Sequence, residues 1–343
     1  MISSKASDLH IVAGVPPMLR LDGELVPTTN HPVLTPEETR RIVYSAMTDN
    51  QKARFEEKYD VDFSLSVQGL ARFRVNVHRQ RGSVAASLRA IPHEILSIED
   101  LRLPQAVYEL ARRPRGLVLV TGPTGSGKST TLAAMIDLIN AERTCHIITI
   151  EDPIEYLHRH KRSVIEQREI EADTHTFSDS LKYALRQDPD VILIGEMRDL
   201  ETISAAITAA ETGHLVLATL HTTDAPQTVD RIIDVFPPHQ QQQIRIQLSV
   251  TLEGVLSQQL LPRAHGKGRV CGVEVLIGTP AVQALIREGK THQLYSVMET
   301  SAKYGMQSLD RALLALFKKG LITHEEALRK ARKKEDLARV MAM

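Results

Sequence analysis

The pattern of apolar and polar positions changes near residue 116. Before that point, apolar residues mostly alternate with polar ones, as in 61–67, which is typical of strands with one buried face. After it, helical patterns separate four almost wholly apolar runs, at 117–120, 147–150, 191–194 and 215–220. Uninterrupted apolar strands that alternate with helices indicate a parallel sheet covered on both faces. The chain is therefore predicted to combine two architectures.

The first part of the chain is predicted to be a small α+β domain. Residues 7–34 combine short apolar stretches with turn residues, which indicates strands joined by a loop and a hairpin. The run from Thr35 to Glu38 has the cap, the proline and the glutamate of a helix start, so a helix is expected over about 36–48. We expect this domain to span residues 1–100 and a linker to follow over 101–115.

The end of the chain is predicted to be mostly helical. Thr279-Pro280 begins a helical pattern that Gly289 ends, and Thr323 caps a later one. We therefore expect an α/β core over residues 116–270 and a helical C-terminal region over 271–343.

Composition places the chain among ordinary globular proteins. It has 343 residues, of which 42% are apolar and 24% charged, enough for two domains. Its 42 basic and 42 acidic residues cancel and tryptophan is absent, so nucleic acid is not an expected partner. Cys145 and Cys271 form no CxxC pattern, which favours a reducing compartment. With no signal-peptide pattern and no apolar run of transmembrane length, we expect a cytoplasmic protein without a transmembrane segment.

A phosphate-binding loop follows the first apolar run. Residues 122–129 fit the pattern GxxxxGK[ST]. Its glycines let backbone N–H groups face an anion, Lys128 reaches the outer phosphates, and Ser129 is suited to ligate Mg²⁺. We expect the nucleotide to be held by Gly122, Pro123, Thr124, Gly125, Ser126, Gly127, Lys128, Ser129 and Thr130. The alternative is a glycine turn without a ligand.

Polar residues follow the other three apolar runs. Glu151 and Asp152 come after the second, Glu196 after the third and His221 after the fourth. Ligands of open α/β sheets lie beyond the carboxyl ends of the strands, so these side chains are expected to share one crevice. We assign Glu196 to water activation or to Mg²⁺, Glu151 or Asp152 to a catalytic and metal role, and His221 to sensing the γ-phosphate. The alternatives are capping carboxylates and a buried packing histidine.

Arginines are expected to neutralise charge on the transferred phosphoryl group. Arg186 and Arg198 flank the run at 191–194, and the first domain supplies Arg72, Arg74, Arg79, Arg81 and Arg89 on alternating strands. A solvated basic strand face is the alternative for the latter. No NKxD motif occurs and no asparagine precedes a lysine, so ATP is favoured over GTP.

The run 185–199, LRQDPDVILIGEMRD, resembles the signature of the type II secretion and type IV pilus ATPase family. The family's acidic box is similar to 148–156 and its histidine box to 214–225, while SDLH near the start and SQQLLPR at 257–263 extend the resemblance over nearly the whole chain. The resemblance implies a hexameric ring with a PAS-like first domain and a RecA-like second one. It also implies that first-domain arginines, best matched by Arg74 and Arg89, close over the nucleotide.

Within this family the chain resembles the retraction motors of twitching motility. Assembly and secretion motors usually carry a paired CxxC zinc module and an additional N-terminal domain, and we expect neither here. Residues 281–289 resemble the AIRNLIRE helix of the retraction motors but depart from it at Val282, Gln283 and Ala284. An ordinary surface helix is the alternative for this segment.

The resemblance implies an ATP-hydrolysing motor that retracts type IV pili from the cytoplasmic side of an inner-membrane platform protein. The basic stretch 329–334 is either a solvated helix face or a docking surface for an acidic platform protein or anionic lipid. The rival functions are the same engine in pilus assembly or type II secretion, a nucleic-acid translocase on a RecA-like ring, and a nucleotide-gated scaffold without catalysis.

Overall fold

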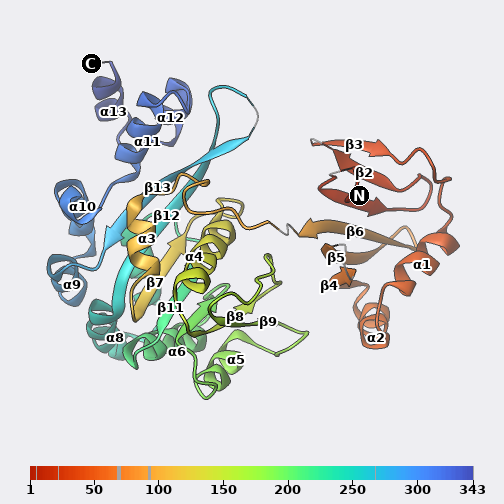
Figure 1. Ribbon diagram of the computed structural model, residues 1–343, viewed down its shortest axis with the longest axis horizontal. Helices are drawn as coiled ribbons and strands as arrows, with labels where there is room; N and C mark the ends of the chain where they lie inside the picture. The colour runs from red at the N-terminus through yellow and green to blue at the C-terminus, as the bar shows by residue number, and fades with distance from the viewer. Residues whose placement is uncertain (5, 22, 68–70, 92–93, 267, 343) are drawn as a thin grey trace. The chain divides into compact units, whose positions relative to one another are not determined.

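The structure is a computed structural model that describes residues 1–4, 6–21, 23–67, 71–91, 94–266 and 268–342 (Figure 1). The chain forms two compact units, Met1–Glu94 and Ile95–Met343. Each unit has its own hydrophobic core, and each is described by itself below.

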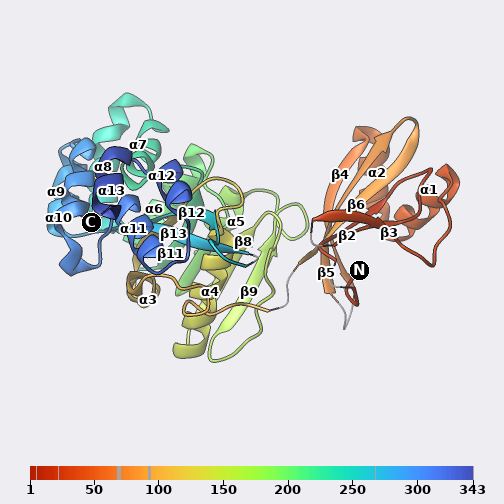
Figure 2. The same cartoon turned by 90° about the horizontal axis from the view of Figure 1, so that it is seen from above.

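The first unit is an antiparallel six-stranded sheet with two helices. The strand order is β3-β2-β1-β6-β5-β4. The strands are β1 Asp8–Ile11, β2 Met18–Leu21, β3 Glu24–Pro27, β4 Asp60–Val67, β5 Ala71–Gln80 and β6 Ser83–Ile91. Helices α1 Pro36–Ser45 and α2 Asp49–Lys58 lie on the same side of this sheet (Figure 2). Phe55, Val75 and Val77 are at the centre of the core between them.

Both helices of the first unit begin with a capping box. The hydroxyl of Thr35 accepts from the Glu38 amide, and the Glu38 carboxylate accepts from the Thr35 amide; Thr48 and Gln51 repeat the arrangement in α2. Such caps contribute about 1 kcal/mol each to helix stability. The helix start predicted at Thr35 is confirmed.

The second unit is built on a seven-stranded sheet with the order β13-β12-β7-β11-β10-β8-β9. The strands are β7 Gly116–Thr121, β8 His146–Glu151, β9 Val164–Glu169, β10 Val191–Ile194, β11 Leu215–Leu220, β12 Leu252–Pro262 and β13 Arg269–Ile277. All neighbouring strands are parallel except β12 and β13, which pair antiparallel. The four predicted apolar strands are β7, β8, β10 and β11, and they occupy the centre of the sheet.

Helices cover both faces of this sheet. They are α3 Gln105–Ala111, α4 Lys128–Glu142, α5 Phe177–Ala184, α6 Leu200–Glu211, α7 Ala225–Asp234 and α8 Pro238–Thr251. Helices α3 and α4 pack together on one face, and α5, α6, α7 and α8 lie on the other (Figure 2). This division follows from right-handed crossovers between parallel strands. The predicted α/β class is confirmed.

Two parts of the sequence-based domain plan differ from the structure. Residues 101–115 were expected to be a linker, yet they contain α3, whose Val107 and Leu110 are fully buried in the core of the second unit. The region 271–343 was expected to be helical, yet β13 occupies its first residues. The pattern of β12, with three polar residues in its middle, fits neither a regular strand nor a helix, so the hairpin could not be read from periodicity.

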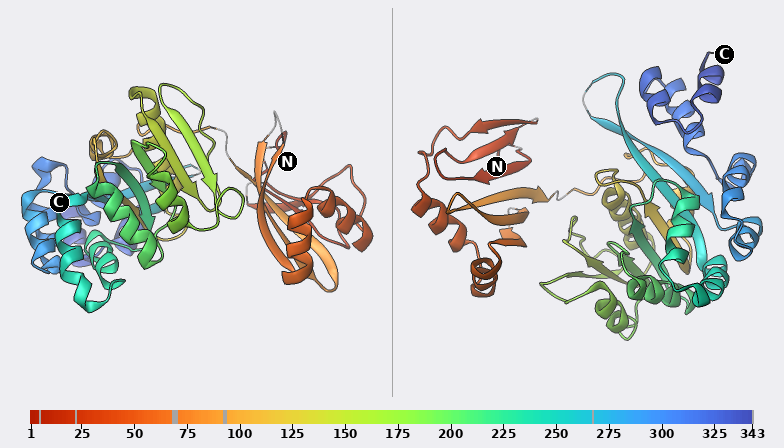
Figure 3. Two further views of the ribbon diagram at one scale, coloured as in Figure 1. Left: turned by 90° about the horizontal axis from the view of Figure 1, so that it is seen from below. Right: turned by 180° about the vertical axis from the view of Figure 1, so that it is seen from behind.

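The remainder of the second unit is helical. It comprises α9 Pro280–Arg287, α10 Leu294–Thr300, α11 Leu309–Lys318, α12 His324–Lys330 and α13 Lys334–Met341, with 3₁₀ turns at Thr291–Gln293 and Ala302–Tyr304. Helices α11, α12 and α13 pack against the outer end of the β12–β13 hairpin (Figure 3). Leu261, Leu313 and Ile322 are buried in the small core that they share. In the described residues, no helix combines the length and the apolar character needed to cross a membrane.

Candidate nucleotide-binding site

Three glycines with positive φ shape the loop between β7 and α4. Gly122, Gly125 and Gly127 have φ values of 140°, 77° and 93°, a region that residues with a Cβ atom rarely adopt. At Gly122 there is also no room for a side chain, because a Cβ atom would overlap the carbonyl oxygen of Gln258 and lie 2.6 Å from Ser126 Oγ. The loop conformation therefore depends on glycine at these places.

The first turn of α4 presents open donors. The first bond within the helix runs from the amide of Thr131 to the carbonyl of Gly127, so the amides of residues 128–130 have no acceptor inside the helix. The hydroxyl of Ser126 is buried and, among the described residues, has no hydrogen-bond partner. Buried polar groups are normally paired. With the positive end of the helix dipole, these donors fit an anion such as a nucleotide phosphate.

Lys128 points its charge into the loop. Its side chain is 8% exposed, and Nζ donates to the carbonyl oxygens of Gly122 at 2.9 Å and Pro123 at 3.2 Å. Burial lowers the pKa of Lys128, while the carboxylates of Glu196 and Glu155 act in the opposite direction. The lysine therefore lies in the electrostatic field of the acidic residues that follow the neighbouring strands.

The other predicted loop residues differ in exposure. Pro123, Thr124 and Gly125 are exposed at the tip, whereas Ser129 and Thr130 are half-buried in the first turn of α4. Ser129, the predicted Mg²⁺ ligand, thus lies beside the open amides. In the described part of the chain, no group of three or more His, Cys, Asp and Glu side chains forms a metal site by itself.

Glu196 is held by two basic side chains. Arg198 contacts both carboxylate oxygens, at 2.7 Å and 2.6 Å, and His221 Nε2 lies 3.0 Å from Glu196 Oε1. Burial would raise the pKa of Glu196, but Arg198 and His221 outweigh it and bring the pKa below its usual value. The carboxylate is therefore ionised at neutral pH and fixed in orientation. The structure brings these three predicted residues together.

Gly195 explains why the acidic residue comes one position later than in the usual nucleotide motif. A Cβ atom at Gly195 would lie 3.2 Å from both the Cα atom of Glu151 and the carbonyl oxygen of Ile150. Its own carbonyl accepts a hydrogen bond from Thr219 Oγ1 at 2.5 Å. A longer side chain at 195 would push β10 away from β8, so the carboxylate is supplied by the next residue.

Glu151 faces partners outside this cluster. Its carboxylate accepts from Thr149 Oγ1 at 2.6 Å, Gln167 Nε2 at 3.3 Å and the Glu155 amide at 3.5 Å. Burial raises the pKa of Glu151 to about 7 in spite of these hydrogen bonds. The side chain is thus turned toward β9, and its catalytic and metal roles stay predictions. Asp152, the alternative residue, is exposed.

Arg186 does not join the cluster. It is exposed in the turn between α5 and β10, and the carbonyl oxygen of the next residue, Gln187, lies 3.0 Å from His146 Nδ1 at the amino end of β8. Glu196 follows the opposite end of β10, and four strand residues span ~13 Å. Within one chain, Arg198 therefore lies beside Glu196 and Arg186 lies at the other end of β10, and the catalytic role of Arg186 stays a prediction.

Arg74 and Arg89 are neighbours on the first unit. They are direct cross-strand partners on β5 and β6, on the face opposite the core residues Phe73 and Val75. Both side chains are exposed, and Arg89 Nε donates to Asp8 Oδ1 at 2.8 Å. Their predicted place side by side on one strand face is present in the structure.

Sequence reasoning gave no role to three residues that contact α4 or influence the charge of Lys128. Gln258 on β12 donates to Thr131 Oγ1 at 2.7 Å, Tyr156 is hydrogen-bonded to Thr130 at 2.8 Å, and Glu155 acts on the charge of Lys128. Gln258 could have been noticed as one of three consecutive polar residues between the apolar ends of β12. Tyr156 and Glu155 lie in the acidic box at 148–156, but only the fold brings this segment to α4.

Comparison with known proteins identifies the relationship. The model of the family described as type II/IV secretion system protein matches residues 1–329. The chain belongs to this family. It is 51% identical over 95% of its length to the type IV pilus retraction ATPase PilT of Pseudomonas aeruginosa, covering 94% of that protein. It is 50% identical over 95% of its length to a twitching motility protein of Neisseria gonorrhoeae, covering 87% of that chain.

A solved structure agrees with this assignment. The crystal structure of the pilus retraction motor PilT with bound ADP superimposes with a TM-score of 0.93 at 51% identity, covering 98% of this chain and 96% of that one. The protein is accordingly an ATPase of this family, and the loop at 122–130 has the motif and the geometry typical of a nucleotide-binding loop. The predicted family and enzyme class are confirmed.

Proposed function

We propose that this protein is a motor that hydrolyses ATP and uses the cycle to retract type IV pili. The observation that carries the proposal is the open phosphate loop with Lys128 in the field of Glu196, whose carboxylate Arg198 and His221 hold in place. The retraction direction is supported by similarity to retraction motors over nearly the whole chain. With only two cysteines, the chain also lacks the paired CxxC zinc module that assembly and secretion motors usually carry.

Different residues of the site would bind the phosphates, hold Mg²⁺ and activate the attacking water. The amides of 128–130 and Lys128 bind the phosphates, and we assign Mg²⁺ to Ser129 and Glu196, directly or through water. Bound Mg²⁺ would supply neutralisation of the phosphate charge. Glu196, ionised because its pKa is low, orients and deprotonates the attacking water. His221 contacts Glu196, and we assign it to sensing the γ-phosphate.

Arginine supplies the remaining positive charge. Arg198 already neutralises Glu196, so a further donor is needed for the transferred phosphoryl group. We assign this to Arg74 and Arg89 of the first unit. Both side chains are exposed and lie directly opposite each other, and Arg89 would exchange its ion pair with Asp8 for a phosphate.

We further propose that the working form is a hexameric ring on the cytoplasmic side of the inner membrane, where it engages the platform protein of the pilus. In such an assembly ATP turnover would depend on contacts between copies of the chain. Similarity to the retraction motors supports this arrangement.

The test is complementation of a pilus-bearing bacterium whose retraction motor has been deleted. We expect the protein, but not its Lys128→Ala variant, to restore twitching, while the deletion strain keeps its extended pili. Restoration of pilus formation in a strain without an assembly motor would instead favour the assembly function. Purified protein should hydrolyse ATP at the same rate with and without DNA or RNA, since stimulation by either would favour the translocase.

A further inference from the structure

The basic stretch 329–334 makes ion pairs inside the second unit. Arg329 contacts Glu326 within its own helix at 2.6 Å, and Lys333 lies 3.4 Å from Glu299. Arg332 reaches a different element: its NH1 lies 3.6 Å from Asp224 Oδ2, just before α7. The side chain of Arg332 thus connects the C-terminal helices to the segment that precedes α7 in the α/β core.

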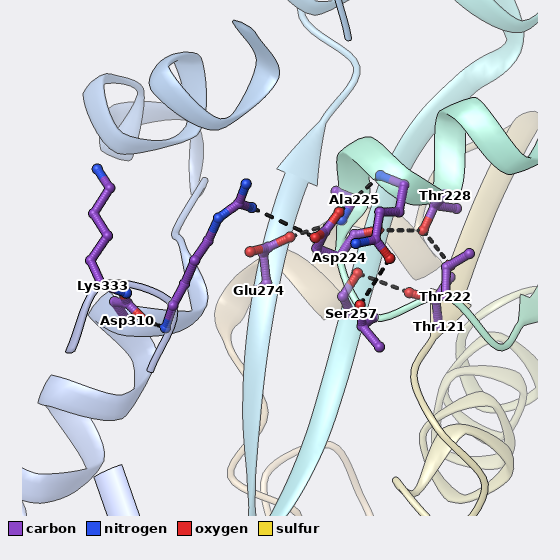
Figure 4. A network of polar contacts seen from close by, with 12 residues as sticks. Thr121, Thr222, Asp224, Ala225, Thr228, Ser257, Glu274, Asp310 and Lys333 are labelled. Carbon is purple, nitrogen blue, oxygen red and sulfur yellow. Dashed lines mark hydrogen bonds and ion pairs between the residues drawn. The ribbon is translucent and has the colours of Figure 1, made fainter. Parts of the chain in front are cut away.

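Arg332 is oriented from two sides. The carboxylate of Asp310, in the first turn of α11, accepts from the amides of Arg332 at 2.7 Å and Lys333 at 2.9 Å (Figure 4). The guanidinium of Arg332 lies over the ring of Tyr295, 4.4 Å from its centroid. The backbone and the side chain of Arg332 are therefore both fixed, and its charge points toward Asp224.

Asp224 belongs to the same short segment as His221. Its Oδ1 accepts from the amide of Gln227 at 2.8 Å and so caps α7, while Oδ2 faces Arg332. Three residues earlier, His221 Nε2 lies 3.0 Å from the carboxylate of Glu196. Residues 221–224 are thus held by Glu196 at one end and by Arg332 at the other.

Glu274 on β13 reinforces this connection. It is 2% exposed, and its carboxylate accepts from the Ala225 amide, in the first turn of α7, at 2.8 Å (Figure 4). It also accepts from the amide of Leu309, the first residue of α11. The buried carboxylate of Glu274 therefore connects the start of α7 to the start of α11.

We propose that Arg332 is a positioning residue for ATP hydrolysis, which holds Asp224 and thereby places His221 against Glu196. This inference rests on the proposed function of the site. Arg332 does not touch the nucleotide loop; it acts through the segment 221–224. A displacement of α11–α13 would consequently change the hydrolysis rate without changing the groups that bind the phosphates.

The test is a double-mutant cycle on the full-length protein with ATP turnover as the readout. Arg332→Gln removes the charge, and Asp224→Asn removes its partner while keeping a good N-cap for α7. We expect each single variant to lower kcat ~5- to 20-fold with KM within about twofold of wild type, because a small misplacement near the reacting groups affects the chemical step. The double variant should be no slower than the worse single variant.

Two further variants separate positioning from stability. Arg329→Gln removes a bidentate ion pair from the same basic stretch and should leave kcat within about twofold of wild type. Arg332→Lys keeps the charge and should recover part of the lost rate. Melting temperatures of all four single variants should agree within a few degrees, since partly exposed ion pairs contribute little to stability.

The inference is overturned if Arg332→Gln turns over ATP like Arg329→Gln, or if the losses in Arg332→Gln and Asp224→Asn simply multiply. It is also overturned if the loss of rate follows the loss of melting temperature across the set, because the contact is then structural. Wild-type protein that binds ATP without hydrolysing it would instead refute the proposed function, and with it this inference.

Discussion

Lys128 donates to two carbonyl oxygens of its own loop, Gly122 and Pro123, and a phosphate would replace both. Lys128→Ala should therefore abolish ATP turnover and strongly weaken nucleotide binding, because the buried point charge that faces the outer phosphates is lost. Turnover and binding of a fluorescent ATP analogue measure the two effects. Lys161→Ala, which removes an exposed ion pair with Asp137, is the matched control. Turnover at the wild-type rate in Lys128→Ala would show that this loop is not the phosphate site.

Glu196 is expected to be needed for ATP hydrolysis but not for ATP binding. Glu196→Gln keeps the shape of the side chain but cannot accept the proton of water, so we expect ATP binding to persist while turnover falls by ~10²-fold or more. Glu201→Gln makes the same change at an exposed position on α6 and should leave turnover unchanged. Joint loss of binding and turnover in Glu196→Gln would identify the residue as a direct metal ligand or a structural group instead.

The sequence alone could predict the loop and Glu196 because both depend on local chemistry next to apolar strands. It could not predict which way a side chain turns at a strand end. Glu196 meets Arg198 and His221, whereas Glu151 turns toward Thr149 and Gln167. That choice is made by neighbours from distant parts of the chain.

At the scale of elements, periodicity predicted the four central strands of the sheet in the second unit. It missed the strands on either side of them. β7, β8, β10 and β11 have uninterrupted apolar sequences because helices cover both faces. β9 and β13 are the edge strands, and β12 lies between β13 and β7. The hairpin of β12 and β13 carries polar residues with specific contacts, such as Gln258 and Glu274. Their strand structure depends on pairing that no local pattern encodes.

Glu274 accepts hydrogen bonds at the starts of α7 and α11, and its titration should change the free energy of unfolding with pH. Burial raises the pKa of Glu274 to about 7 from an ordinary 4.5, although the amides of Ala225 and Leu309 favour the charged form. Between these pH values the folded protein binds more protons than the unfolded chain, so the free energy of unfolding falls as pH rises. Each pH unit costs up to about 1.4 kcal/mol.

The check is denaturant unfolding of wild type and Glu274→Gln across this pH range. Glutamine still accepts from both amides but does not titrate, so the stability of wild type relative to the variant should decrease from about pH 5 to about pH 7. The pKa of Glu151 is also raised to about 7, so its titration affects stability in the same direction. This contribution is present in both proteins and cancels in the difference between their stabilities. Parallel stability curves would contradict the burial of an ionisable Glu274.

At the scale of the whole molecule, the sequence predicted two architectures but placed their boundary inside the second unit. The segment 105–111 has a helical pattern with no sign of which core it joins, and in the structure this helix packs against α4 and β12. Family resemblance supplied what periodicity could not, including the roles of Arg74 and Arg89, which lie in a unit without a nucleotide motif.

If Arg74 or Arg89 neutralises the transferred phosphoryl group, the second unit alone should bind ATP and hydrolyse it poorly. The fragment must begin at residue 95, because a start at 115 would remove the buried Val107 and Leu110. An arginine donated by another element is worth ~10³ to 10⁵ in turnover in other phosphoryl-transfer enzymes, which sets the upper range here. Turnover should also rise with protein concentration as subunits assemble.

The decisive comparison sets the full chain and the fragment 95–343 beside Arg74→Ala, Arg89→Ala and Arg79→Ala, with the oligomeric state measured for each. Arg79 is the matched control, because it pairs with Glu56 at 2.8 Å and stacks on Tyr59 within the first unit. We expect Arg79→Ala to keep the wild-type rate, and Arg74→Ala or Arg89→Ala to lose turnover while keeping both assembly and ATP binding. Loss of assembly in the same variants would make these arginines interface residues. Wild-type turnover in Arg74→Ala, in Arg89→Ala and in the fragment 95–343 would mean that Arg198 alone is enough to neutralise the phosphoryl group. The first unit would then act only as a mechanical lever.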